Sequence, residues 1–445
     1  MTKRPGKATS TPLIREVRGG VSTEIRTTPG GVTFLAAPMP HMASVSVGVW
    51  VAVGGRFEPE PITGASHFIE HMVFKGTHRR SAREISEAVE CYGGYMNAFT
   101  SEENTCFYAR AAKEYFDDML DVLMDMVLQS RFAPADISKE REVIKDELAM
   151  YLDQPQQHVQ EILNVMEWPG HPLGRPLTGT TKSLDALKRK TLVEHHRQHY
   201  TAPNMVIAAA GNLDLDRAWK TVLDLTRSVA PGERSTFTAP TISQTDAGIK
   251  LHTKPVEQTS LALGFRTCSR HEEQRFALRL LNALLGENMS SRLFQRIRED
   301  RGLAYNIYSS LSFFEDAGDL VISASLENSN LRPALGLAVR ELRDLARRPP
   351  SVAELQRARD YVIGQMELSL EGTENRMMWL GEQWLGYGHL MPAEAIRERL
   401  ARVTPSEVHS AARQFLRPER ANLALVSPIK STRGLAPILA RLGQG

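Results

Sequence analysis

The sequence predicts an α+β protein made of two homologous domains of similar fold, each a largely antiparallel sheet packed with helices. The chain has 445 residues, which is too long for one ordinary core. Residues 228–248 are rich in Pro, Gly, Ser and Thr and lack apolar periodicity, as a linker does. This segment divides the chain into halves of about 200 residues, a usual domain size. The halves also resemble each other, which predicts one fold used twice.

The repeat is clearest near the end of each half. Residues 187–212 and residues 400–428 both combine a helix, a proline turn and an apolar strand. The charged helix around 142–150 has a counterpart at 359–368. Each half also begins with alternating apolar and polar residues, which is typical of strands.

These observations predict five segments. We expect a disordered tail over 1–19, a first domain over 20–227, the linker over 228–248, a second domain over 249–430 and a tail over 431–445. The first segment is basic and contains two prolines, but it lacks the apolar core of a secretory signal.

Composition excludes several classes of function. The net charge is +2, so no broad basic surface for nucleic acid is expected. No run of about 18 apolar residues is present, which predicts that the chain does not span a membrane. The three cysteines, Cys91, Cys106 and Cys268, are too few and too scattered for a disulfide framework. They fit a reducing compartment, and we expect the cytoplasm, or the mitochondrial matrix in a eukaryote.

A short motif within residues 64–77, GASHFIEHMVFKGT, carries the chemistry. This segment is expected to be helical, so His67 and His71 project from one face and can reach one Zn²⁺ ion at about 2.0–2.1 Å. Glu70 lies beside the same face, where its carboxylate can take a proton from water activated by the metal. The pattern H-x-x-E-H is a metallopeptidase signature. From the motif alone, a pair of surface histidines beside a glutamate is the alternative.

A catalytic zinc site usually has three protein ligands and one open position. The charged helix over 138–151 offers four carboxylates for the third ligand, namely Glu140, Glu142, Asp146 and Glu147. Spacing within the helix does not choose among them, and a solvated charged face is the alternative for most of them.

At this point the sequence resembles the pitrilysin/insulinase family of zinc peptidases, in its short branch with mitochondrial processing peptidase and bacterial homologues. The family pattern is a Gly, eight or nine residues, and then G-x-S-H-x-x-E-H. Here Gly55 is followed by eight residues and by Gly64 to His71. The similarity extends over roughly residues 20 to 430 and implies a processing-peptidase-like fold.

The resemblance implies roles for two carboxylates. The family's third metal ligand is a Glu about 76 residues after the second His, which corresponds to Glu147. A further family Glu, implicated in activity, stands seven residues earlier and corresponds to Glu140.

The resemblance also implies a substrate site. Residues 93–110 are similar to the family's strand whose edge binds an extended peptide by strand addition. The positions expected to offer backbone groups are Asn97, Ala98, Phe99 and Thr100. In the second half, Arg298 and Tyr305 stand where the family has an Arg/Tyr pair. By analogy Arg298 holds the substrate backbone and Tyr305 donates to the developing oxyanion.

The second half departs from the family's catalytic pattern. It has no H-x-x-E-H, and the matching helix is FALRLLNALLGE at 276–287. Our alignment places Met366 at the position of Glu147. The second domain is therefore expected to be non-catalytic.

A second histidine cluster competes with the motif. Glu194, His195, His196 and His199 follow one another closely, and His195 and His199 also have a spacing of four residues. We interpret this cluster as a solvated helix face, and a second metal site as the less favoured alternative.

Together these features predict a zinc metalloendopeptidase that hydrolyses short unfolded or presequence-like peptides. The resemblance also implies that a two-domain chain of this length pairs with a second chain, so we expect a homodimer, or a heterodimer with a related subunit. The alternative is a non-catalytic structural core subunit with the same fold. Specific processing of one peptide, rather than general degradation, is a further possibility.

Overall fold

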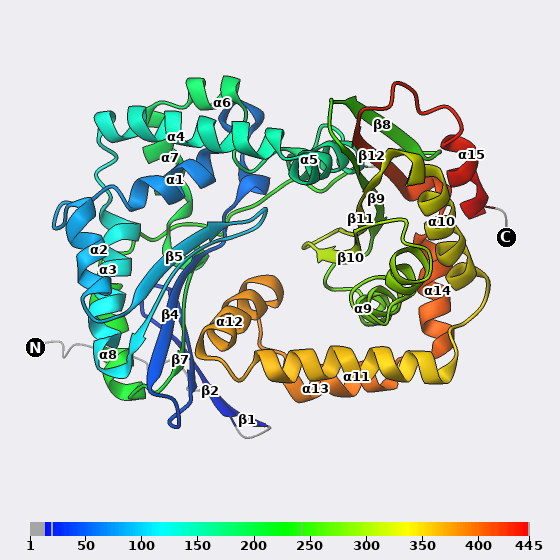
Figure 1. The fold of residues 1–445 in the computed structure, drawn as a ribbon. Coiled ribbons are helices and arrows are strands. Elements are labelled where there is room, and N and C mark those ends of the chain that lie inside the picture. Colours follow the sequence, from blue (N-terminus) through cyan, green and yellow to red (C-terminus); the bar gives the residue numbers. More distant parts are fainter. Residues whose placement is uncertain (1–13, 19–20, 242, 444–445) are drawn as a thin grey trace, which may run out of the picture.

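The computed structural model describes residues 14–18, 21–241 and 243–443. It confirms the predicted α+β class: two sheets, each accompanied by helices, lie on opposite sides of the molecule (Figure 1). Within the described residues, the first sheet has seven strands and the second has five. No helix in this part of the chain is long and apolar enough to cross a membrane.

The first sheet places its expected substrate strand at an edge. Its spatial order is β1 (Ile14–Arg18), β2 (Val21–Thr27), β3 (Thr33–Pro38), β7 (Met205–Gly211), β4 (Ser44–Val51), β6 (Thr105–Ala112) and β5 (Tyr95–Thr100). Strands β3 and β7 are parallel, and the other neighbours are antiparallel.

The second sheet repeats the pairing pattern of the first. Its order is β10 (Asn306–Phe313), β11 (Gly318–Glu327), β9 (Gln258–Thr267), β12 (Ala421–Ser427) and β8 (Gly248–Thr253). Three antiparallel pairs are followed by one parallel pair, β12 with β8. The same sequence of pairs runs from β5 to β3 in the first sheet. The internal repeat predicted from the sequence is therefore a repeat of topology.

Helices cover both sheets. In chain order they are α1 (Ala65–Val73), α2 (Ala82–Glu90), α3 (Phe116–Gln129), α4 (Pro134–Asp153), α5 (Pro155–Glu167), α6 (Thr181–Ala186), α7 (Arg189–His199), α8 (Leu215–Leu225), α9 (Gln274–Leu285), α10 (Leu331–Arg347), α11 (Val352–Ser369), α12 (Thr373–Tyr387), α13 (Ala393–Arg402), α14 (Pro405–Phe415) and α15 (Ala436–Leu439). Helix α3 packs against β4 and β6, and α9 packs against α11 and α14. Each domain thus has its own apolar core.

Helices α4 and α11 are held in the same way in the two domains. The guanidinium of Arg141 in α4 donates to the carbonyls of Leu184 and Leu187, at 2.9 and 2.6 Å. The guanidinium of Arg359 in α11 donates to the carbonyls of Leu400 and Val403, at 3.2 and 2.8 Å. These matching bonds fix the alignment of the two helices.

This alignment corrects one expectation from the sequence. When Arg141 is paired with Arg359, the counterpart of Glu147 is Gln365. Met366 corresponds to the buried Leu148 instead. The expectation of Met366 was wrong by one residue because it rested on similar apolar residues in the two sequences rather than on the buried face of each helix.

Each half of the chain gives one helix to the sheet of the other half. Helix α5 packs on β9 and β12 of the second sheet, whereas α12 packs on β3, β4 and β7 of the first. At the second contact, Gly381 of α12 lies so close to the Trp50 ring that a Cβ there would be 2.2 Å from a ring carbon. The segment at 228–248 thus separates the two sheets in sequence, while the exchanged helices tie the two domains together.

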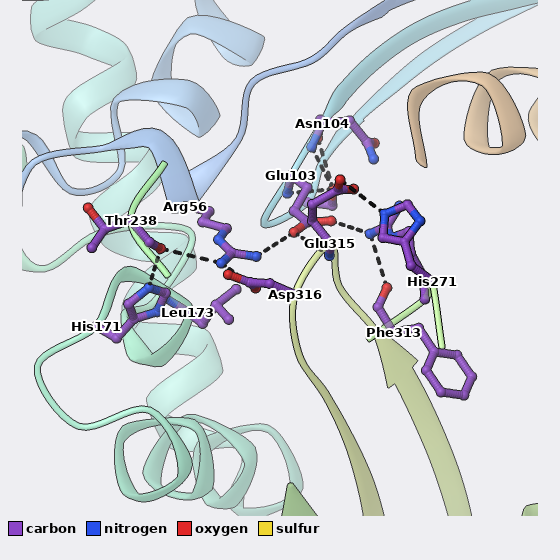
Figure 2. Close-up of polar contacts among 12 residues, drawn as sticks. Arg56, Glu103, Asn104, His171, Leu173, Thr238, His271, Phe313, Glu315 and Asp316 are labelled. Carbon is purple, nitrogen blue, oxygen red and sulfur yellow. Dashed lines mark hydrogen bonds and ion pairs between the residues drawn. The ribbon is translucent and has the colours of Figure 1, made fainter. Parts of the chain in front are cut away.

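A buried ionic network joins the domains beside the hairpin turns of both sheets (Figure 2). The guanidinium of Arg56 is fully buried and donates to Glu103 Oε1 at 2.6 Å and to Asp316 Oδ1 at 2.5 Å. Arg270 contacts the other oxygen of Glu103 and the Phe313 carbonyl. Glu103 lies in the β5–β6 turn and Asp316 in the β10–β11 turn, so one arginine connects the two sheets.

Both predicted tails contain folded parts. Residues 14–18 form β1 and pair with β2. Near the C-terminus, Leu435, Ile438, Leu439 and Leu442 are buried in the second core. The remainder of the predicted tails, residues 1–13 and 444–445, lies outside the described residues, as do residues 19–20.

Candidate metal and catalytic site

Helix α1 presents the motif because its other face is apolar. Phe68, Ile69 and Met72 are buried in the first core, which leaves His67, Glu70 and His71 on the opposite, partly exposed face.

The start of α1 is capped by a distant carboxylate. The helix begins after Gly64, which has φ 94° and lies against Gly179. Glu58 accepts hydrogen bonds from the backbone N–H groups of Gly64, at 2.7 Å, and Ser66, at 2.6 Å. Burial raises the pKa of Glu58 to about 7, although the two N–H groups and Arg175 lower it. Sequence analysis missed Glu58 because the cap comes from outside the helix.

The two imidazoles, both from α1, converge on one point with the carboxylate of Glu147 from α4. His67 Nε2 lies 3.8 Å and His71 Nε2 lies 3.6 Å from Glu147 Oε2. The centroids of the two rings are 4.7 Å apart. Among the described residues, this is the one group of three or more His, Cys, Asp or Glu whose ligand atoms lie close enough to hold a metal ion.

These separations fit a zinc ion. Ligand atoms at the usual bond lengths around tetrahedral zinc are about 3.3 Å apart. The observed 3.6 and 3.8 Å therefore require only a small contraction. Of the four carboxylates that the sequence left open, the geometry selects Glu147.

The protonation state of His67 suits a ligand. Burial, followed by the nearby His71, lowers the pKa of His67 to about 4, while Glu147 acts in the opposite direction. The ring is therefore neutral near pH 7, with a lone pair available to a metal. Its Nδ1 is buried and has no hydrogen-bond partner.

Glu140 lies behind His71 rather than beside the metal position. Its side chain is 3% exposed, with one carboxylate oxygen 3.2 Å from His71 Nδ1 and the other 2.7 Å from Lys75 Nζ. A carboxylate on the second ring nitrogen orients a ligating histidine and fixes its tautomer. The structure thus brings Glu140 into the site through His71.

Glu70 is held by the strand that was expected to bind substrate. The Thr100 hydroxyl donates to Glu70 Oε2 at 2.6 Å. Burial raises the pKa of Glu70 above its ordinary value, and the bond from Thr100 lowers it in part. A carboxylate poised in this way can exchange a proton with water in the site.

Tyr151 is a further residue of the site that sequence analysis missed. One helical turn after Glu147, its hydroxyl donates to Glu147 Oε1 at 2.9 Å, which leaves Oε2 facing the histidines. The spacing of four residues on one helix could have revealed this contact. A cavity of about 470 Å³ opens in front of these groups, lined also by Ala98, Phe99 and Thr100.

Strand β5 contains all four residues expected to bind substrate and lies at the edge of its sheet. Its ladder pairs it with β6 on one side. The side chain of Asn97 accepts a bond from the Ala98 N–H at 2.9 Å. The unpaired edge next to the cavity is suited to the addition of a peptide strand.

Arg298 and Tyr305 are not brought to the metal residues within one chain. The Arg298 guanidinium lies 5.7 Å from the Tyr305 ring and 4.7 Å from that of Phe294. Tyr305 is 78% exposed, directly before β10. In Figure 1 this strand lies apart from α1, in the other half of the molecule.

The interpretation of the second histidine cluster as a solvated face was wrong. His195 and His199 of α7 are buried, and His196 is largely enclosed. Each has a protein partner: Ser66 Oγ for His195 at 3.2 Å, the Val127 carbonyl for His196 at 2.7 Å and Ser235 Oγ for His199 at 2.7 Å. Burial lowers the pKa of all three, so they are neutral packing residues.

Two family models match the chain. Residues 34–181 match the model of the insulinase family, peptidase family M16, and residues 186–362 match that of the peptidase M16 inactive domain. His67, His71 and Glu147 all fall within the first match. The second match begins within the predicted first domain and runs across the predicted linker, so the two matches do not follow the predicted domain bounds.

Relatives of similar length carry related descriptions. An uncharacterized zinc protease of Mycobacterium tuberculosis is 36% identical over 412 residues, covering 92% of this chain and 94% of that protein. The uncharacterized zinc protease YmxG of Bacillus subtilis is 37% identical over 399 residues, covering 89% and 96%.

Solved structures share the fold at low sequence identity. A protease from Helicobacter pylori matches with a TM-score of 0.86 and 20% identity, covering 91% of this chain and 99% of that one. A chain of complex III₂ from Candida albicans matches with a TM-score of 0.81 and 16% identity, covering 94% and 99%. From its sequence relatives and family models together, this chain belongs to the insulinase family of peptidases, peptidase family M16.

Proposed function

We propose that the protein is a zinc metalloendopeptidase in which His67, His71 and Glu147 hold the metal. The observation that carries this proposal is the convergence of two Nε2 atoms from α1 and one carboxylate oxygen from α4, at separations that fit a zinc ion. When bound there, zinc would serve as a Lewis acid that polarises a peptide carbonyl and lowers the pKa of water.

The chain's own residues supply the proton transfers. Glu70 accepts a proton from the attacking water and later gives it to the leaving amine, because its carboxylate faces the cavity and burial raises its pKa above the ordinary value. Thr100 holds Glu70 in place, and Tyr151 holds Glu147. Glu140 fixes the ring of His71.

The substrate proposed is a short, extended peptide. The free edge of β5 offers backbone groups at Asn97 to Thr100, next to Glu70. A cavity of about 470 Å³ accommodates side chains of such a strand but not a folded domain. Presequence-like peptides belong to this class.

A homodimer is the proposed assembly. Arg298 and Tyr305 lie in the second domain and are exposed, and in the described residues no contact joins them to the metal ligands of the same chain. A second copy of the chain could bring its own pair to the site. The alternative, a non-catalytic core subunit, is less favoured because the likeness to complex III concerns the fold, while the ligand set of this chain is complete.

The cytoplasm is the proposed compartment. All three cysteines are free in the structure, as expected in a reducing environment, and two of them, Cys106 and Cys268, are buried.

The proposed function is tested with purified protein and its Glu70→Gln variant. Zinc content is measured by mass spectrometry, and cleavage is measured on a mixed library of short peptides. The proposal predicts equal zinc in the two proteins and cleavage by the parent alone, since Gln cannot accept the proton. Equal cleavage by both proteins would contradict it.

A further inference from the structure

A second cavity, of about 510 Å³, lies in the second domain. This volume is in the range of about 300–1,000 Å³ that is usual for ligand sites. Its apolar wall includes Phe276, Tyr361, Met366, Met391, Ile396 and Leu400. None of these residues belongs to the site described above.

This cavity occupies the place in the second domain that the metal site occupies in the first. The first cavity is lined by α1, β5, α4, α5 and the segment after α5. The second is lined by α9, β10, α11, α12 and the segment after α12, together with α13. Gln365 and Ser369, the counterparts of Glu147 and Tyr151, line it. The second domain therefore has a cavity at the same place, but its lining lacks the two histidines and the glutamate of the first domain.

One buried cation in this cavity lacks an acidic partner. Arg275 of α9 is 9% exposed, and none of the described Asp or Glu residues forms an ion pair with it. Its one hydrogen bond is to the Glu272 carbonyl, at 3.3 Å. Its guanidinium lies 4.4 Å from the Phe276 ring and 5.4 Å from the Tyr387 ring. Buried guanidinium groups are usually paired, so this position suits an anionic ligand.

The other charges around the cavity cancel. Arg279 binds Glu287 through both of its terminal nitrogens, one at 2.6 Å. Arg399, whose guanidinium lies 5.5 Å from the centroid of the Phe276 ring, is paired with Glu273. Arg275 thus gives the cavity one net positive charge next to a large apolar wall.

We propose that this cavity binds the C-terminal end of a peptide that ends in a bulky apolar residue. The terminal carboxylate pairs with Arg275, and the last side chain packs among Phe276, Met391 and Ile396. The amide side chains of Gln365 and Gln383 line the same cavity and can bond the peptide backbone, which a fatty acid would not need. This site requires no metal and is independent of the proposed proton transfers.

The test measures binding to the Glu70→Gln protein by calorimetry, so that the probe is not cleaved. The probes are N-acetyl-Gly-Gly-Gly-Phe with a free carboxylate, the same peptide as its C-terminal amide, and octanoate. The proposal predicts that the free acid binds at least about tenfold more tightly than the amide, because only the acid forms a charge-assisted pair. Octanoate is expected to bind more weakly than the peptide acid.

Three further variants locate the binding. Arg275→Gln is expected to weaken binding of the acid by about tenfold or more and to leave the amide unchanged. Ile396→Trp places a larger side chain in the cavity and is expected to weaken the binding of both peptides. This variant keeps the test valid if Arg275→Gln folds poorly. Arg227→Gln removes an exposed charge that is paired with Asp224, and it is expected to leave the binding of all probes unchanged. Equal binding of acid and amide, octanoate binding as tightly as the peptide, or acid binding that survives both pocket variants would overturn the proposal.

Discussion

The two imidazoles of the candidate metal site differ in the hydrogen-bond partners of their Nδ1 atoms. His71 has a buried carboxylate, Glu140, on its Nδ1, whereas the Nδ1 of His67 has no hydrogen-bond partner. Glu140 also binds Lys75, so the position of its carboxylate is fixed from two sides. This arrangement orients His71, and through it Glu140 would influence activity without direct contact with substrate.

Glu140→Gln is predicted to weaken zinc binding by about 10- to 100-fold, because the amide holds His71 less firmly and no longer supports its basicity. The measurement is a competition titration with a zinc chelator. Glu142→Gln is the matched control, since Glu142 lies on the same helix, is exposed and binds only Lys145. Similar zinc affinities for the two variants would show that Glu140 does not act through His71.

Thr100→Val is predicted to move the acidic limb of the pH–activity profile to higher pH. The bond from Thr100 lowers the pKa of Glu70, so its loss raises that pKa further. A general base works only when ionised, and activity is lost as the pH falls through its pKa. Thr100→Ser retains the hydroxyl and should follow the parent. An unchanged acidic limb in the valine variant would argue against Glu70 as the base.

The sequence was sufficient to predict how residues close together in the chain lie relative to one another. It was not sufficient for residues that only folding brings together. His67, Glu70 and His71 could be placed on one helix face from their spacing alone. Choosing Glu147 over its neighbours on α4 depends on how α4 packs against α1, and there the family resemblance supplied the answer. Glu58 lies in a loop, so its contacts with α1 leave no periodic signal.

At the scale of elements, the order of the strands and the exchange of helices between the domains could not be predicted from the sequence either. Alternating residues predict strands and their burial, but the crossing of α5 and α12 between the sheets depends on packing between halves distant in sequence. The internal repeat could be recognised in the sequence, because each half must bury the same helix faces against a similar sheet. The exchanged helices and Arg56 then hold the β5 hairpin next to the second domain.

Arg56→Met is predicted to destabilise the protein by about 3 kcal/mol, since it leaves Asp316 without its ion-pair partner and Glu103 with Arg270 alone. Chemical denaturation with matched circular dichroism and fluorescence probes measures the change. Arg83→Met, which removes one member of an exposed pair with Glu87, should change stability by no more than about 0.5 kcal/mol. Equal effects of the two substitutions would mean that the network contributes little.

At the scale of the whole molecule, one fold is used twice with different chemistry. The first hollow contains the histidines and Glu147, while the second contains Gln365 and an unpaired Arg275. The exposed Tyr305 lies outside both cavities in the described chain. This position is consistent with the proposal that Tyr305 serves the site of a second copy of the chain.

Mixing two inactive variants tests this assembly. Glu70→Gln lacks the base and Tyr305→Phe lacks the proposed donor, so each homodimer is expected to be impaired at both sites. Subunit exchange creates heterodimers in which one site has both groups, and activity is predicted to recover to about one quarter of the parent value. If Tyr305→Phe is impaired by itself, absence of recovery despite exchange shown by mass spectrometry would place Tyr305 in the same chain as the site it serves. Full activity of Tyr305→Phe alone would place it outside the mechanism.

The most direct test of the metal site is zinc stoichiometry after dialysis against metal-free buffer, measured for the parent, Glu147→Ala and Asp146→Ala. The geometry predicts about one zinc per chain in the parent and in Asp146→Ala, whose side chain is exposed next to the ligand. Glu147→Ala is predicted to lose the metal. Zinc retained equally by all three proteins, or absent from the parent after incubation with zinc, would contradict the account.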